Sequence, residues 1–155
     1  MLAFSLSPIS VREAFAVCRW RWDGPFTPFA FRCGDEPLLL DRRLRYHGAH
    51  RAGTLAGFAC FSDDAQVIGG EYPEDALDLG LGLAPPLVGQ GLGRPLAEAV
   101  MAHATTRFAP ALLRVTVAES NLPALRLFYG LGFAEARRFH GRTRAGEQGF
   151  VVLVR

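Results

Sequence analysis

The sequence contains no lysine, so all 17 of its basic side chains are arginines. Together with 15 acidic residues they give a formal net charge of only +2. So small an excess creates no broad positive field, and we therefore expect no nucleic-acid partner. We interpret the arginine bias as codon usage in a GC-rich genome.

Long hydrophobic runs are also absent. No apolar stretch approaches the roughly 20 residues that a membrane-spanning helix needs, because Arg, Asp, Glu or Gly interrupts each one. The residues before Arg12 carry no basic side chain and no long apolar core, which argues against a secretory signal. We expect a cytoplasmic protein with no membrane partner.

Cysteine and histidine are few and scattered. Cys18, Cys33 and Cys60 are odd in number and lack the paired spacing of a zinc site, so we interpret them as reduced fillers. His47 and His50 are close enough in sequence to bind a metal, but exposed positions on a loop or strand edge explain them better. We predict no metal cofactor.

The length and composition suit one globular domain. Half of the 155 residues are apolar and 21% are charged, and a chain of this size buries roughly 68–70% of its unfolded surface. Neither a repeat nor a linker interrupts the sequence. We predict a single domain over residues 1–155.

Hydrophobic periodicity and turn residues predict an alternation of helices and strands. The Ser10/Glu13 pair is a capping box, which predicts the first helix. We expect the start of this helix to include Ser7 and Pro8. An aromatic loop follows at residues 20–31. The remaining predicted elements are helices at 36–45, 94–109 and 121–131, strands at 46–51, 54–61, 77–83 and 113–117, and a closing hairpin of 134–140 with 149–154.

The turn Gly89-Gln90-Gly91-Leu92-Gly93 lies between a predicted strand and a predicted helix. Its glycines free several backbone N–H groups to point at one spot, with the positive end of the helix behind them, so it can bind a pyrophosphate. Two better-known glycine loops are excluded. Arg94-Pro95 follows instead of Lys-Ser/Thr, and the third glycine comes one residue too early for Gly-x-Gly-x-x-Gly. Taken alone, the turn could equally be a glycine-rich helix entry.

Residues 121–133, NLPALRLFYGLGF, supply a second motif. Together with the glycine turn and the strand before it, this segment resembles the GNAT superfamily of acetyl-CoA-dependent N-acetyltransferases over about residues 54–139. The aromatic block at 20–29 is similar to one bacterial branch of that superfamily. The resemblance implies an α/β GNAT fold, in which a central mixed, mainly antiparallel sheet is flanked by about four helices. The cofactor cleft would lie between two splayed strands.

The same resemblance implies acetyl transfer from acetyl-CoA (CoA) directly to a primary amine of a small molecule or protein. The acceptor would thus be a small-molecule or peptide amine, and a homodimer is compatible with the sequence. Two residues depart from the pattern, because Val88 replaces a usual Arg or Gln and Phe128 takes the usual place of a tyrosine. The cofactor-binding residues that the resemblance implies are Leu81, Gly82, Leu83, Val88, Gly89, Gln90, Gly91, Leu92, Gly93, Arg94, Asn121, Ala124 and Phe128.

The catalytic groups are less clearly marked. In such enzymes an N–H near Leu83 stabilises the oxyanion, an acid protonates the departing thiolate and a base takes the proton of the amine. Tyr129 is the candidate acid, with water as the alternative, although successive helical residues point about 100° apart and Tyr129 therefore does not simply replace Phe128. Asp78, Glu71 and then Glu119 are the candidate bases, or else solvated and structural carboxylates.

Trp20, Trp22, Phe26 and Phe29 are the candidate acceptor-binding residues. The resemblance places their segment beside the acceptor site, and aromatic rings attract an amine by cation–π interaction. The alternative is an aromatic lid packed on the core. Two other functions remain open: a catalytically degenerate CoA-binding sensor or scaffold, motivated by Val88 and Phe128, and a nucleotide-binding protein that uses the glycine turn for ATP or NAD.

Overall fold

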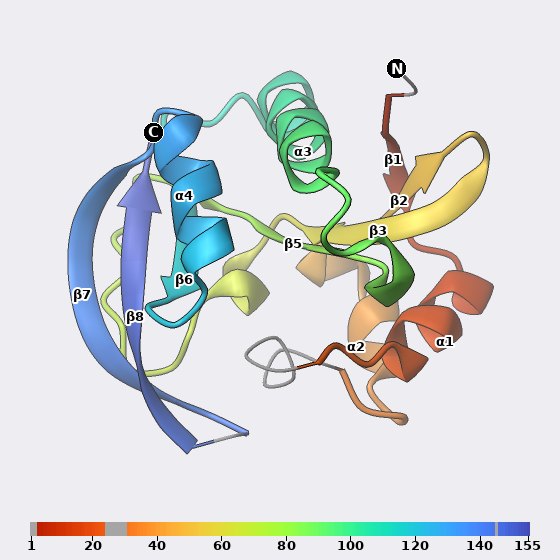
Figure 1. Cartoon of the computed structure of the whole chain (residues 1–155), viewed down its shortest axis with the longest axis horizontal. Coiled ribbons are helices and arrows are strands. Elements are labelled where there is room, and N and C mark those ends of the chain that lie inside the picture. The colour runs from red at the N-terminus through yellow and green to blue at the C-terminus, as the bar shows by residue number, and fades with distance from the viewer. Residues whose placement is uncertain (1–2, 24–30, 145) are drawn as a thin grey trace.

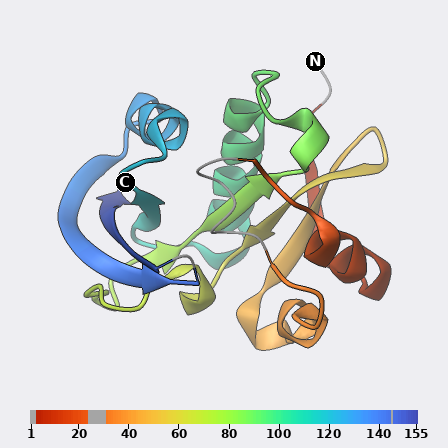
Figure 2. The same cartoon turned by 60° about the horizontal axis from the view of Figure 1, so that its bottom comes forward.

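A computed structural model describes residues 3–23, 31–144 and 146–155 of the protein. Two four-stranded sheets, in the orders β1-β2-β3-β5 and β4-β6-β8-β7, carry helices on both sides (Figures 1 and 2). The mixed α/β architecture expected from the sequence is therefore present. The elements are β1 (Ser5–Pro8), α1 (Val11–Arg19), α2 (Glu36–Leu40), β2 (Tyr46–Arg51), β3 (Thr54–Cys60), β4 (Leu77–Asp78), β5 (Gly80–Leu83), α3 (Gly93–Phe108), β6 (Leu113–Ala118), α4 (Leu122–Gly130), β7 (Ala134–Thr143) and β8 (Gly146–Val154).

The start of α1 confirms the predicted capping box. The Ser10 side chain accepts a hydrogen bond from the Glu13 N–H, and the Glu13 carboxylate accepts one from the Ser10 N–H. The prediction that the helix begins at Ser7 was wrong. Residues up to Pro8 instead form β1, an edge strand antiparallel to β2, where a proline is tolerated because it need not donate to a ladder.

Turn chemistry also explains the β2–β3 hairpin. Ala52 and Gly53 take φ of 48° and 77°, the pair of positive angles that a tight two-residue hairpin turn requires. The predicted helix at 36–45 is shorter than expected. It stops at Leu40, because Asp41 turns extended and its carboxylate accepts the Arg43 N–H to open a short 3-10 turn.

The predicted strand at 77–83 is divided between the two sheets. β4 pairs in parallel with β6, whereas β5 pairs antiparallel with β3. The Leu79 N–H still donates to the Arg114 carbonyl across the boundary, at 2.9 Å. Beyond Leu79 the two strands belong to different sheets, so β5 and β6 diverge.

One continuous core joins the two sheets. Buried residues of α3 belong to the same hydrophobic cluster as Ala49 and Phe61 of the first sheet region and Val115 and Leu153 of the second. Figure 1 shows α3 above the first sheet, α1 and α2 below it, and α4 beside β6 and β8 of the second sheet. Within the described ranges, no helix is both long and apolar enough to cross a membrane. The buried α3 residues are Leu96, Ala97, Val100, Met101 and Ala104.

Candidate functional site

The glycine turn requires glycine for its backbone angles rather than for space. Gly89 and Gly91 have φ of +83° and +76°, and a Cβ added at either would meet nothing within 4 Å. A side chain there would strain the left-handed backbone without any clash. The turn is thus an open surface feature that leads directly into α3.

The first turn of α3 has the character of an anion site. Leu92 is the N-cap residue and provides no side-chain hydrogen bond in the described structure, so the N–H groups around Gly93 are left for water or a ligand. Pro95 has no N–H to satisfy. These donors and the positive end of a 16-residue helix favour a phosphate group at this point.

The outer edge of β5 is the second part of the site. The Ala84 N–H donates to the Ala56 carbonyl at 2.8 Å, and the antiparallel register places Gly82 opposite Phe58. Bonded pairs alternate along such a ladder, so the main-chain groups of Leu81 and Leu83 point away from β3. They face the space that opens where β5 and β6 diverge.

An aromatic group packs on β5 and reaches the same outer edge. The Phe58 ring lies against Gly82, where an added Cβ would come within 2.6 Å of Cε1. Trp22 packs on Phe58 with ring centroids 6.5 Å apart, and its indole N–H donates to the Leu83 carbonyl at 2.8 Å. Sequence reasoning found Trp22 but missed Phe58, because only strand pairing brings Phe58 to Gly82.

Of the other predicted aromatic residues, Trp20 lies within the described part of the chain. Trp20 meets Trp22 edge to face at 6.1 Å, while Phe26 and Phe29 lie outside the described residues. Phe31 and Tyr46 continue the cluster from Phe58, with centroids 5.3 Å (Phe31–Phe58) and 6.5 Å (Tyr46–Phe58) apart. The Tyr46 hydroxyl donates to Asp64, a carboxylate that the sequence did not single out.

Asp78, the first candidate base, has a structural partner. Both of its carboxylate oxygens bind the buried Arg114 guanidinium, at 2.7 and 2.8 Å, and the Gln66 amide donates to it as well. The hydrogen bond to Asp78 raises the pKa of Arg114. Both carboxylate oxygens are occupied within the protein, so the geometry counts against Asp78 as the base.

The other candidate catalytic residues lie apart. The Glu71 side chain is 91% exposed and 3.7 Å from Arg137, and Glu119 pairs with Arg138 at 3.3 Å. Tyr129 is 44% exposed, whereas Phe128 beside it is buried against Phe133. The structure therefore turns Tyr129 to solvent and gives Phe128 a core position.

The polar residues around the turn are engaged with the protein itself. Asn121 caps α4 by accepting the Ala124 N–H at 3.3 Å. The Gln90 amide donates to the Pro86 carbonyl, and Arg94 pairs with Glu98 at 2.9 Å. Val88 is 42% exposed, and its apolar side chain cannot make the polar contact that the resemblance implies for this position.

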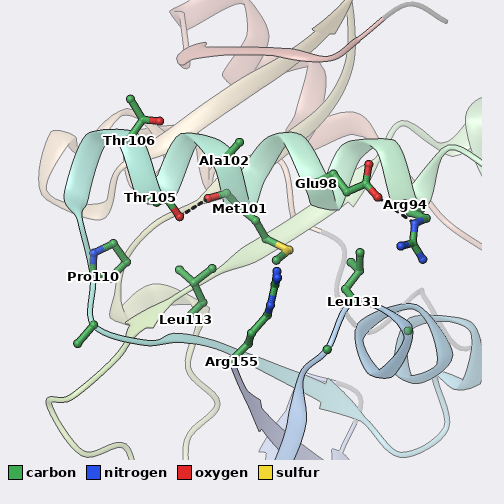
Figure 3. A pocket seen from close by; sticks show the side chains of 13 residues that line it. Arg94, Glu98, Met101, Ala102, Thr105, Thr106, Pro110, Leu113, Leu131 and Arg155 are labelled. Atoms are coloured by element: carbon green, nitrogen blue, oxygen red, sulfur yellow. Dashed lines mark hydrogen bonds and ion pairs between the residues drawn. The ribbon is translucent and has the colours of Figure 1, made fainter.

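A pocket of about 970 Å³ lies between α3, the start of β6 and the end of α4. Figure 3 shows Arg155 pointing into it toward Met101, with Leu113 at the start of β6 and Leu131 after α4. It is lined by the start of β6 rather than by its diverging end. Arg94 and Glu98, at the start of α3, line it as well, whereas Leu81 and Leu83 do not.

A family assignment agrees with this geometry. The profile of the Acetyltransferase (GNAT) family matches residues 14–133, a span that contains the glycine turn, both diverging strands and α4. The chain belongs to the acetyltransferase (GNAT) family. Members of this family use acetyl-CoA, and the uncapped turn and the open strand edge are features that fit it.

The curated relatives are mycothiol acetyltransferases. That of Thermobispora bispora is 39% identical over 85 residues, which cover 55% of this chain and 28% of the relative. That of Thermomonospora curvata is also 39% identical over 85 residues, covering 55% of this chain and 26% of the relative. The chain thus matches little more than a quarter of these proteins.

Solved acetyltransferase structures share the fold. A GNAT-family acetyltransferase from Bacillus anthracis has a TM-score of 0.75 at 13% identity, covering 99% of this chain and 94% of that one. A spermidine N-acetyltransferase variant from Vibrio cholerae scores 0.71 at 17% identity, with 99% and 93% covered. The yncA protein of Salmonella typhimurium, solved with acetyl-CoA, scores 0.68 at 16% identity, with 99% and 93% covered. At these identities the likeness concerns the fold alone.

Proposed function

We propose that the protein is a single-domain, cytoplasmic N-acetyltransferase that moves an acetyl group from acetyl-CoA to a primary amine of a small molecule or peptide. The observation that carries this proposal is the uncapped glycine turn of α3 beside the open edge of β5. The turn offers donors to a phosphate, and the edge offers successive main-chain groups to an extended arm. Acetyl-CoA supplies an acetyl group activated as a thioester.

Each part of the site has a distinct task in this proposal. The N–H groups of residues 89–94 hold the pyrophosphate, helped by the Arg94 guanidinium once it leaves Glu98. Leu81 and Leu83 bind the arm through their main-chain groups, with Gly82 between them. Asn121 and Ala124 at the start of α4 border the other side of the arm, while Phe128 supports α4 from the core.

The reaction also needs a group that accepts the proton of the amine. The attacking amine must be neutral, because ammonium has no lone pair, so a carboxylate or water must accept its proton. Asp78 is tied to Arg114 and Glu71 extends into solvent, so we propose that ordered water carries the proton to solvent. The departing thiolate resembles a cysteine in acidity, with a pKa of about 8.5, and can be protonated by water.

Isothermal titration and thiol release test the proposal together. We expect saturable binding of acetyl-CoA, followed by release of free CoA that depends on an added amine. The panel should include spermidine, since one protein of the same fold is a spermidine N-acetyltransferase, and a peptide with a free N-terminus. No saturable binding at millimolar acetyl-CoA would exclude the function.

A second candidate is a CoA-binding sensor without turnover. Phe128 favours it, since a buried phenylalanine stands where the resemblance implies an acid tyrosine. A sensor would bind acetyl-CoA with the same saturation but release no CoA with any amine of the panel. The titration and the thiol assay therefore separate an enzyme from a sensor.

A further inference from the structure

Trp22 contacts the strand that is proposed to bind the cofactor arm. Its indole Nε1–H donates to the Leu83 carbonyl at 2.8 Å, across 61 positions of sequence. Trp22 follows α1 in the chain, and Figure 1 shows α1 and α2 below the first sheet. The contact thus joins the aromatic block to the edge of β5.

The Leu83 carbonyl is one of few main-chain acceptors on this edge. β5 is the last strand of its sheet, paired only with β3 among the described strands. The alternation of bonded pairs directs the groups of Leu81 and Leu83 outward. A hydrogen bond from a side chain to Leu83 therefore takes a position at which an added chain would pair.

Packing fixes the indole in this position. Its ring lies 6.5 Å from Phe58 and 6.1 Å from Trp20, centroid to centroid. Phe58 in turn rests on Gly82, between the two outward-pointing leucines. The donor is thus held at the edge of β5 by the same aromatic surface that covers the strand.

We propose that Trp22 and the amide arm of acetyl-CoA compete for the Leu83 carbonyl, so that binding of the arm displaces the indole. This inference rests on the proposed function, in which an extended arm adds to the edge of β5. Trp22 is then a residue that sets cofactor affinity, in addition to any contact with the acceptor. Displacement couples the cofactor site to the aromatic surface on the acceptor side.

Affinity measurements on Trp22→Phe test the competition. This variant keeps an aromatic ring but has no N–H, so we expect it to bind CoA about two- to tenfold more tightly than the wild type, the range of one ordinary hydrogen bond. The control ligand is 3′-phospho-ADP, which carries the diphosphate of CoA but lacks the arm. Its affinity should be the same for both proteins.

Fluorescence gives a second measurement that does not depend on the stability of Trp22→Phe. The chain has two tryptophans, so Trp20→Phe leaves Trp22 as the single emitter. We expect CoA to shift this emission to longer wavelength, because the displaced indole enters water. The arm-free 3′-phospho-ADP should cause no shift.

The outcomes separate the two proposals. If the wild type binds neither ligand, the proposed function fails. If the wild type binds CoA, but Trp22→Phe binds it equally or more weakly and the Trp22 emission stays unchanged, only the competition is overturned. Tighter binding of CoA by Trp22→Phe, with an arm-dependent shift, supports it.

Discussion

Arg114 on β6 and Asp78 on β4 form a two-point ion pair beneath the place where the sheets part. The guanidinium Nε and Nη2 lie 2.7 and 2.8 Å from the two carboxylate oxygens, and both residues are buried. A third donor of Arg114 reaches the Pro73 carbonyl at 2.8 Å. The pair therefore joins β4, β6 and the loop before β4 at the closed end of the cleft.

Removing one partner of this pair should destabilise the protein strongly. We expect Asp78→Ala to lower the free energy of unfolding by about 3–5 kcal/mol, because it leaves the buried guanidinium with only the exposed Asp75 carboxylate, 3.6 Å away, as a counter-charge. Urea denaturation measures the change. Arg142→Ala, which breaks the exposed pair with Glu147, is the control and should not move the midpoint. A loss of under about 1 kcal/mol for Asp78→Ala would contradict a structural role for the pair.

Two glycines with nearly the same φ allow a matched test of the phosphate site. Gly91 in the turn and Gly53 in the β2–β3 hairpin have φ of +76° and +77°, and neither has an atom within 4 Å of an added Cβ. Alanine should strain both by about 1–2 kcal/mol. We expect only Gly91→Ala to weaken CoA binding, by about tenfold or more, the loss of roughly one charge-assisted hydrogen bond. Equal affinities of the two variants in isothermal titration would remove the turn from the site.

Tyr129 offers a test of the acid role that the family pattern suggested. Its side chain is 44% exposed, on a different face of α4 from the buried Phe128. We expect Tyr129→Phe to lower kcat by no more than about twofold. Loss of a general acid would lower it far more, because general acid–base catalysis contributes about 10²–10⁴-fold. Steady-state thiol release over a pH series is the measurement. A fall of a hundredfold, with loss of the alkaline limb, would restore Tyr129 as the acid.

A pair of histidines should make stability depend on pH. The rings of His47 and His103 lie 4.9 Å apart between β2 and α3, and both contact Phe61. Burial lowers the pKa of His47, while burial and then the neighbouring His47 and Arg107 lower the pKa of His103. The folded protein thus binds fewer protons than the unfolded chain at mildly acidic pH.

The sign of this dependence follows from linkage. The stabilising contribution is complete above the ordinary histidine pKa of about 6.5 and is lost as pH falls below it. We expect the melting temperature to drop between pH 7 and pH 5, and to drop less in His103→Phe, which keeps a ring but cannot take up a proton. His140→Phe, at an exposed position of β7, is the control. An equal drop in all three proteins would contradict the effect.

Features encoded locally could be predicted from the sequence. The Ser10/Glu13 capping box, the Ala52-Gly53 turn and the helix that follows the glycine turn all depend on residues within a few positions of one another. The closing hairpin was also predicted, although β7 and β8 are longer than expected. The family resemblance added the prediction that the cofactor cleft lies between two diverging strands.

Features that depend on distant pairing could not be predicted. The division of the strand at Leu79 is decided by β3 on one side and β6 on the other, neither of which leaves a mark on residues 77–83. Asp78 appeared free to act as a base, because its partner Arg114 lies 36 positions away. Phe58 likewise becomes part of the site only through its register with Gly82.

The break at Leu79 also has a consequence for how the chain comes to its native state during synthesis. Every strand of the first sheet lies before residue 84, and every strand of the second begins at residue 77 or later. All four strands of the first sheet are therefore synthesised before β6, β7 and β8. α3, the helix that begins at the glycine turn, then covers the apolar face of the first sheet and joins it to the second sheet.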